Sequence, residues 1–211
     1  MGAIDPKIAS QAKRHLGKAE ARWKPLFRAV GSCTLEADPD CYSVLVKSII
    51  SQQISGGAAR TIIGRVQTLC GKTGFKPTNL TKLTDQQLRD SGVSANKTVS
   101  IRQLTERFQS RRNYTRFLNQ LTDEEVIQEL LPVRGIGRWT AQMFLIFSLG
   151  RLDVWPTNDL GVRDGVKQLL EQEELPTLPH MEELSQPWQP YRTIAAWYLW
   201  RLRDLPKPQS E

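Results

Sequence analysis

The helical spacing of its apolar residues is the feature of this 211-residue chain that most restricts its fold. No stretch alternates apolar and polar residues with period two for long enough to predict a sheet. Thr122 and Glu125 have the spacing of a capping box, which begins a helix, and Thr84 begins a similar short helix that Gly92 ends. Expected helices lie at about 84–92, 95–110, 123–131, 137–149 and 190–202, the last with Pro190 at its first position, and expected loops lie at 71–77, 151–158 and 174–190. The sequence therefore predicts an all-α fold.

Composition excludes several classes of protein. With 39% hydrophobic and 24% charged residues, the chain is neither disordered nor fibrous. The longest apolar run, residues 194–200, is far shorter than the roughly 20 residues that span a bilayer. The chain begins without a basic segment followed by an apolar core, so we expect a soluble protein kept inside the cell. Three unclustered cysteines, Cys33, Cys41 and Cys70, predict no disulfide framework, no zinc site and no iron–sulfur cluster.

Charge is distributed unevenly along the chain. The net charge is +7, but residues 47–116 carry 13 basic and 3 acidic side chains, whereas residues 117–211 carry 9 basic and 14 acidic ones. A segment as basic as 47–116 could bind a polyanion such as nucleic acid. It could equally be a solvated face that only keeps the protein soluble. Charge alone leaves both interpretations open.

Residues 131–141 contain the most informative motif, Gly135-Ile136-Gly137. Two glycines around one aliphatic residue allow a tight turn between helices, and Ile136 would anchor that turn in the core. The amides after the turn lie at the start of the next helix, where a phosphate is favoured. An ordinary helix–helix connection would have the same three residues, so the motif needs support from its context.

That context resembles the helix-hairpin-helix DNA glycosylase superfamily over about residues 39–205. Asp159 follows Gly137 by 22 residues, after an apolar helix and a loop, and the segment 49–55 ends one helix with two adjacent glutamines. Within the superfamily the chain is most similar to the DNA-3-methyladenine glycosylase II family. The resemblance implies a single glycosylase unit, 1–211, with two helical lobes and an active site in the cleft between them. One lobe would comprise 37–150 with the hairpin, and the other 1–36 plus 151–211.

The resemblance also implies roles for individual residues. Asp159 matches the catalytic aspartate, although it also precedes a helix as an N-cap would, and both roles are compatible. Gln53 matches the side chain that enters the duplex, and its alternative is a buried amide bonded to the loop backbone. Trp139, Met143 and Trp200 match positions lining the base pocket, where simple core packing is the alternative for each.

Further implied roles concern the hairpin. The residues that would contact the DNA backbone are Gly135, Gly137, Arg138 and Thr140. The carbonyls that would bind a monovalent cation, Na⁺ or K⁺, belong to Leu131, Val133 and Gly135. Met143 stands where the family often has a tyrosine, which leaves the substrate range open.

The resemblance implies a monofunctional glycosylase that removes alkylated bases, such as 3-methyladenine, from double-stranded DNA during base excision repair. Such an enzyme needs no cofactor beyond the possible cation, and we expect a monomer in the cytoplasm with the chromosomal DNA. One alternative is a bifunctional glycosylase that also nicks the strand, but the lysine of that branch is replaced by Trp139. The other is a DNA-binding module without catalysis, which would need neither Asp159 nor a tryptophan-lined pocket.

Overall fold

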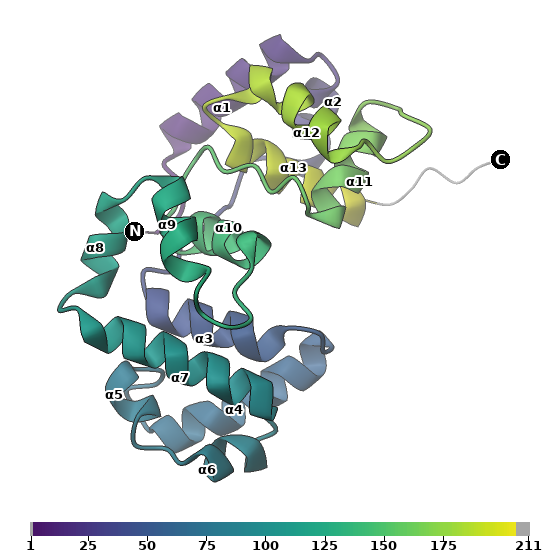
Figure 1. Ribbon diagram of the computed structural model, residues 1–211. Coiled ribbons are helices and arrows are strands. Elements are labelled where there is room, and N and C mark those ends of the chain that lie inside the picture. The colour runs from purple at the N-terminus through teal and green to yellow at the C-terminus, as the bar shows by residue number, and fades with distance from the viewer. Residues whose placement is uncertain (1, 206–211) are drawn as a thin grey trace. The chain divides into compact units, whose positions relative to one another are not determined.

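The computed structural model describes residues 2–205, and its regular structure is helical (Figure 1), apart from one isolated antiparallel bridge between Ala3 and Glu36. The all-α prediction is therefore confirmed. The helices, in chain order, are α1 (Pro6–Ala19), α2 (Trp23–Val30), α3 (Cys41–Ser51), α4 (Gly56–Cys70), α5 (Pro77–Leu80), α6 (Asp85–Asp90), α7 (Ala95–Ser110), α8 (Tyr114–Gln120), α9 (Asp123–Leu130), α10 (Arg138–Phe147), α11 (Leu160–Leu169), α12 (Leu178–Ser185), the 3₁₀ turn η1 (Gln186–Trp188) and α13 (Arg192–Asp204).

The helices that begin at a local capping residue start where the sequence predicts. Thr84 and Thr122 each form a complete capping box, with Gln87 and Glu125 as the reciprocal partners. The predicted helix 95–110 has the bounds of α7. The capping residues therefore set these boundaries without help from distant parts of the chain.

Two sequence predictions are wrong. The segment 174–190 was expected to be a loop, yet it contains α12 and η1, because the Thr177 hydroxyl accepts a hydrogen bond from the His180 amide and Pro179 stands in the first turn. The last helix does not begin at Pro190. It begins at Arg192, after Tyr191 in the N-cap position, and extends to Asp204.

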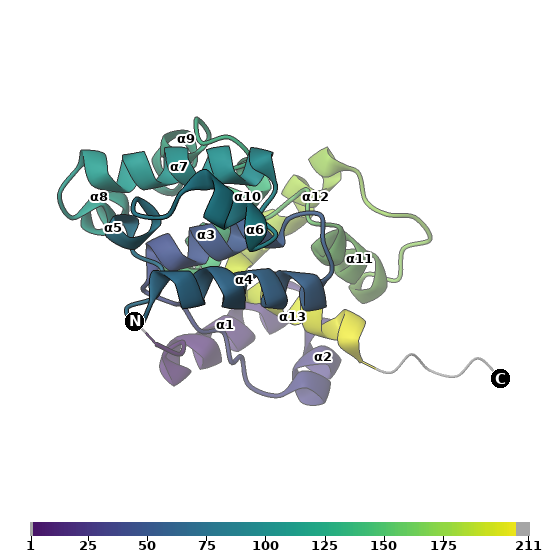
Figure 2. The same cartoon turned by 90° about the horizontal axis from the view of Figure 1, so that it is seen from below.

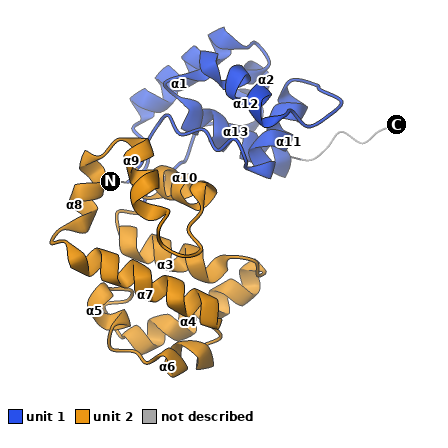
Figure 3. Ribbon diagram, in the orientation of Figure 1, with its two compact units in different colours: residues 1–37, 150–211 blue, residues 38–149 orange. Residues whose placement is uncertain are grey.

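The chain divides into two compact units, which Figure 3 colours separately. Unit 1 comprises residues 1–37 and 150–211, and unit 2 comprises residues 38–149. In unit 1, helices α1 and α2 pack with α13, and α13 also packs against α11. Its core includes Trp23, whose ring meets that of Trp188 edge to face with centroids 5.1 Å apart. Unit 1 is thus built from both ends of the chain.

Unit 2 has its own core, formed around α3. This helix packs against α4, α7 and α10 (Figure 2), and its residues Leu45, Ile49 and Ile50 are fully buried. A buried hydrogen bond of 2.7 Å joins the Tyr42 hydroxyl of α3 to Thr105 of α7. These contacts hold α3, which Gln52 and Gln53 follow, against α7, which carries Lys97.

The three cysteines, Cys33, Cys41 and Cys70, are buried and free. Burial raises the pKa of the Cys33 and Cys70 thiols to about 11, and it also raises the pKa of Cys41.

Across residues 2–205, histidine, cysteine, aspartate and glutamate form no cluster of three that could hold a metal ion. No helix within that range is both long and apolar enough to cross a membrane.

Candidate functional site

Asp159 is the N-cap of α11 in unit 1, and the donors that hold its side chain include a main-chain amide and an indole. As the N-cap residue it accepts a hydrogen bond from the Val162 amide at Oδ1, at 2.8 Å. The indole Nε1–H of Trp200 donates to the same oxygen at 2.9 Å. Asp159 is only 9% exposed. The structure therefore brings Asp159 and Trp200 together and fixes the carboxylate in a largely buried position.

Two glycines of α11 make room for this arrangement. A Cβ on Gly161 would lie 2.8 Å from Nη1 of Arg203, 2.9 Å from Cδ1 of Trp200 and 3.0 Å from Oδ1 of Asp159. One turn later, a Cβ on Gly165 would lie 2.8 Å from the carbonyl oxygen of Leu199. At each glycine the shortest of these separations lies below 3.0 Å, which real Cβ atoms essentially never show, so the close packing of α11 on α13 requires glycine at both positions.

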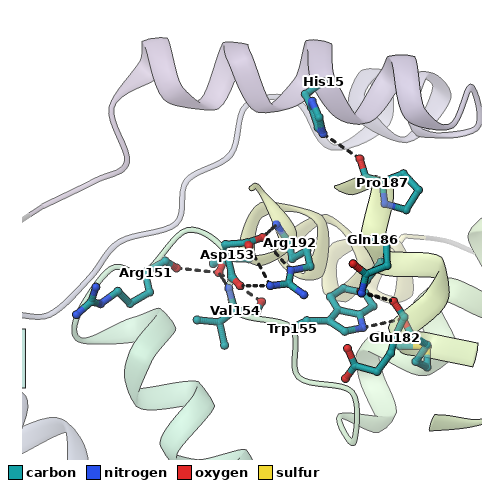
Figure 4. A network of polar contacts seen from close by, with 12 residues as sticks. His15, Arg151, Asp153, Val154, Trp155, Glu182, Gln186, Pro187 and Arg192 are labelled. Carbon is teal, nitrogen blue, oxygen red and sulfur yellow. Dashed lines mark hydrogen bonds and ion pairs between the residues drawn. The ribbon is translucent and has the colours of Figure 1, made fainter. Parts of the chain in front are cut away.

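The loop before Asp159 is tied to α13 (Figure 4). The Asp153 carboxylate pairs with the Arg192 guanidinium through Nε at 2.9 Å and Nη2 at 2.9 Å. The buried Thr193 hydroxyl accepts a hydrogen bond from the Val154 amide at 2.9 Å, and the Trp155 indole donates to a main-chain carbonyl of α12 at 3.0 Å. Asp153 thus anchors the loop that leads to the Asp159 carboxylate.

In unit 2 the Gly-x-Gly turn joins α9 to α10. Val133 and Ile136 are 1% and 3% exposed and anchor the turn in the core, as the sequence predicts for Ile136. Gly135 has φ +80°, and a Cβ there would lie 3.2 Å from Oγ of Ser100. Gly137 is the N-cap of α10, and a Cβ there would meet nothing within 4 Å. The first glycine is therefore required by the fold, whereas the second leaves the approach to the helix start open.

The first turn of α10 carries the other residues expected at the DNA. The Arg138 guanidinium forms a two-point ion pair with Glu124 of α9, at 2.6 and 3.1 Å, and this pairing lowers the pKa of Glu124. Thr140 is 5% exposed, so its side chain belongs to the core. Trp139 is 45% exposed and Met143 is half-buried, which makes core packing a poor description of Trp139.

The two adjacent glutamines after α3 behave differently. Gln53 is exposed and has the left-handed φ of +56°. Gln52 is half-buried, and its Nε2 donates to the Gly135 carbonyl at 2.8 Å. The buried-amide alternative is therefore wrong for Gln53, and it is the half-buried Gln52 whose side chain bonds to the main chain. Sequence reasoning missed Gln52, and the only signal available was its position next to Gln53.

Two of the three carbonyls expected to bind a cation already accept a hydrogen bond within the protein. The Val133 carbonyl accepts a hydrogen bond from the Ile136 amide at 3.0 Å, and the Gly135 carbonyl accepts one from Gln52. A carbonyl oxygen has two lone pairs, so each retains the capacity to accept a second partner. Together with Leu131, these residues of one turn are compatible with a monovalent cation.

Comparison with known proteins gives consistent similarities. Residues 46–190 match the family described as HhH-GPD superfamily base excision DNA repair protein. DNA-3-methyladenine glycosylase 1 of Schizosaccharomyces pombe is 34% identical over 207 residues, covering 94% of this chain and 91% of that protein. The alkylbase DNA glycosidase-like protein mag2 of the same yeast is 32% identical over 200 residues, covering 92% and 94%.

Solved structures agree with the sequence relatives. The crystal structure of a DNA-3-methyladenine glycosidase from Bacillus halodurans has a TM-score of 0.82 at 35% identity, covering 95% of this chain and 90% of that one. The Schizosaccharomyces pombe 3-methyladenine DNA glycosylase Mag1, in complex with abasic DNA, has a TM-score of 0.79 at 32% identity, covering 92% and 97%. With the family match over most of its length and these relatives covered almost end to end, the chain belongs to the HhH-GPD superfamily of base excision DNA repair proteins.

Proposed function

We propose that this protein is a monofunctional DNA glycosylase that hydrolyses the bond between deoxyribose and alkylated bases, such as 3-methyladenine, in duplex DNA. The observation that carries this proposal is the Asp159 carboxylate, buried and fixed at one oxygen by Val162 and Trp200. Similar proteins over nearly the whole chain are named DNA-3-methyladenine glycosylases. A hydrolysis assisted by the Asp159 carboxylate is consistent with the geometry of this site and with the names of these similar proteins.

The chemistry requires a negative charge near the sugar. Breaking the glycosidic bond develops positive charge on the deoxyribose ring, as in an oxocarbenium ion. A carboxylate held in a region of low dielectric stabilises that charge more than one exposed to water. The N-cap and indole hydrogen bonds fix Asp159 before substrate binds, so no reorganisation is needed during the reaction. Asp159 is our proposed catalytic residue.

Aromatic residues are proposed to contact the extruded base. A purine alkylated at a ring nitrogen such as N3 or N7 is cationic, and a cation on an indole face gains about 0.5–2 kcal/mol. Trp200 is the residue proposed from unit 1, next to Asp159, and Trp139 and Met143 are those proposed from unit 2. Because stacking does not read the pattern of hydrogen-bonding groups on the base, we propose a broad range of alkylated substrates.

DNA binding is proposed for unit 2. The amides around Gly135, Gly137 and Arg138 are suited to a phosphate, because the helix α10 begins there with partial positive charge. Thr140 would contribute through its main chain, since its side chain is buried. Gln53, exposed on its loop, is proposed to enter the duplex where the base has left. The basic segment 47–116 lies in the same unit and supplies the sequence-independent attraction.

The hairpin carbonyls of Leu131, Val133 and Gly135 are proposed to hold a Na⁺ or K⁺ ion, which would add positive charge near the phosphate. No other cofactor is proposed. The protein would work as a monomer in the cytoplasm, with the chromosomal DNA.

The test is release of free base from methylated duplex DNA. We expect 3-methyladenine to appear in the supernatant while the strand remains intact and breaks only after alkali treatment. Borohydride should trap no covalent complex, because Trp139 stands where the strand-nicking branch has its lysine. A trapped complex would favour the bifunctional alternative, and tight binding without base release would favour a non-catalytic binding module.

A further inference from the structure

The end of α3 is capped by a lysine from a different helix. Lys97, in the first turn of α7, donates from Nζ to the carbonyl of Ile50 at 2.8 Å and to the carbonyl of Gln52 at 2.7 Å. The last carbonyls of a helix lack partners within the helix and carry partial negative charge, so an ammonium group is well suited to them. Lys97 is half-buried, and desolvation lowers its pKa.

The carbonyl of Gln52 is part of the peptide group that joins Gln52 to Gln53. Fixing this oxygen fixes the plane of the peptide that precedes Gln53, and with it the direction from which the Gln53 side chain leaves the loop. Gln53 has φ +56°, a conformation that is unfavourable for a residue with a side chain and persists only where surrounding contacts impose it. The Lys97 hydrogen bond is a contact of that kind.

The same loop is tied to the hairpin from its other side. The Gln52 side chain donates to the carbonyl of Gly135, so residue 52 is held through its main chain by α7 and through its amide by the turn before α10. The loop that carries Gln53 and the Gly-x-Gly turn are therefore parts of one connected polar network within unit 2.

We propose that Lys97 is a positioning residue for base extrusion: by holding the Gln52–Gln53 peptide, it presents Gln53 to the DNA in the conformation that replaces the departing base. This inference rests on the proposed function, in which Gln53 enters the duplex. Two of the three ammonium donors of Lys97 are used by carbonyls. Its role is therefore distinct from that of a surface lysine that contacts phosphate.

A double-mutant cycle tests this proposal on the full-length protein. The variants are Gln53→Ala, Lys97→Met and the double variant, with single-turnover excision of N7-methylguanine from a fully paired duplex as the readout. Each single variant should be slower by about tenfold, and the double variant should be no slower than the worse single one by more than about twofold. Such non-additivity is expected only if Lys97 acts through Gln53.

Extrusion of the base is measured in a separate experiment, from the fluorescence of a 2-aminopurine placed beside the lesion in the duplex. The fluorescence rise on binding should be reduced for Lys97→Met and Gln53→Ala and retained for Lys97→Arg, which keeps a cation with several donors. Lys18→Met removes one positive charge from an exposed position of α1, outside the segment proposed to attract DNA, and should leave both readouts at the wild-type level.

Two results would overturn the inference. One is wild-type excision and fluorescence in Lys97→Met; the other is a double variant in which the two losses multiply. Thermal melting of each variant detects loss of the fold. If the Tm of Lys97→Met is well below that of the wild type, Lys97→Gln replaces it in the double-mutant cycle, because glutamine can still donate a hydrogen bond to one carbonyl. If the wild-type protein releases no base, the proposed function fails, whereas an active wild type with unaffected Lys97 variants contradicts only this inference.

Discussion

The Asp159 region of unit 1 and the hairpin region of unit 2 are constructed in opposite ways. The Asp159 carboxylate is a single buried side chain, held by an amide and an indole and surrounded by helices that pack closely. The hairpin offers main-chain amides at an open helix start, next to exposed side chains. A charge that must act on one bond needs a rigid, dry setting, whereas a surface that receives a long polyanion must be accessible. Substitutions in the two regions should therefore change different measured quantities.

The largest expected effect comes from Asp159→Asn. The amide oxygen can still accept the Val162 and Trp200 hydrogen bonds, so the variant loses mainly the negative charge. Removal of comparable electrostatic groups in other enzymes slows the chemical step by about 100- to 1000-fold, and we expect a loss of that size in single-turnover excision of 3-methyladenine. Affinity for a duplex with an abasic-site analogue should remain.

The control for this variant is Asp204→Asn, at an exposed position of the same unit. It should excise at the wild-type rate. Equal activity of Asp159→Asn and wild type would show that the carboxylate is not the catalytic group.

Packing of α11 on α13 gives the next prediction. Gly165→Ala would place a methyl group 2.8 Å from the Leu199 carbonyl oxygen, and overpacking of this kind typically costs about 1–3 kcal/mol. For a chain of this size each kcal/mol lowers Tm by about 2–4 °C, which calorimetry can measure. Gly64→Ala in α4 is the matched control. Nothing lies within 4 Å of its Cβ position, so Tm should rise slightly through better helix propensity. Equal shifts in both variants would contradict the close-packing argument.

For the hairpin, Gly137→Val should weaken DNA binding without unfolding the protein. The new side chain meets no atom of the protein within 4 Å, but it would stand at the helix start where a phosphate must approach. Loss of one hydrogen bond to a charged group corresponds to about 1.5–3 kcal/mol, or tenfold or more in Kd, which fluorescence anisotropy at fixed salt can measure. Unchanged affinity would remove the hairpin from the DNA interface.

Gly135→Ala tests whether Gly135, unlike Gly137, is required for the fold as well as for DNA binding. Its φ of +80° and the nearby Ser100 hydroxyl should make this variant lose thermal stability as well as affinity.

The smallest expected effect concerns the Arg138–Glu124 pair. Glu124→Gln removes the carboxylate that pairs with the Arg138 guanidinium and so favours contact of this guanidinium with a phosphate, and because both side chains are 54% exposed the gain should be small. Exposed ion pairs contribute about 0.2–1 kcal/mol, so DNA affinity should rise by about two- to threefold at low salt and less at high salt. Glu106→Gln makes the same charge change at another exposed position of unit 2. An equal rise in both variants would attribute the effect to net charge and not to Arg138.

Local signals explain what the sequence could predict. Thr84, Thr122 and Asp159 each begin a helix by accepting a hydrogen bond from the amide three residues ahead, so their roles as N-caps can be predicted from a few adjacent residues. Ile136 is flanked by glycines, and its burial follows from the tight turn. The all-α fold follows from the same kind of short-range pattern, repeated along the chain.

Contacts between distant residues explain what the sequence could not predict. Helix α12 is a different case: its start signals, Thr177 and Pro179, are local, but they stand in a segment rich in residues typical of loops. Which of two adjacent glutamines is exposed depends on the left-handed conformation of Gln53 and on Gly135, more than 80 residues away. The requirement for glycine at position 165 arises from α13, and nothing in the residues around 165 indicates it.

The buried thiols have a consequence for the conditions under which this protein would work. Electrophiles that methylate DNA also methylate sulfur, and they react with the thiolate form. Cys33 and Cys70 have a pKa of about 11 and Cys41 a raised pKa, and all three are buried, so at neutral pH they present little thiolate and little access. A repair enzyme with this pattern would keep its cysteines unmodified during the same chemical exposure that creates its substrates.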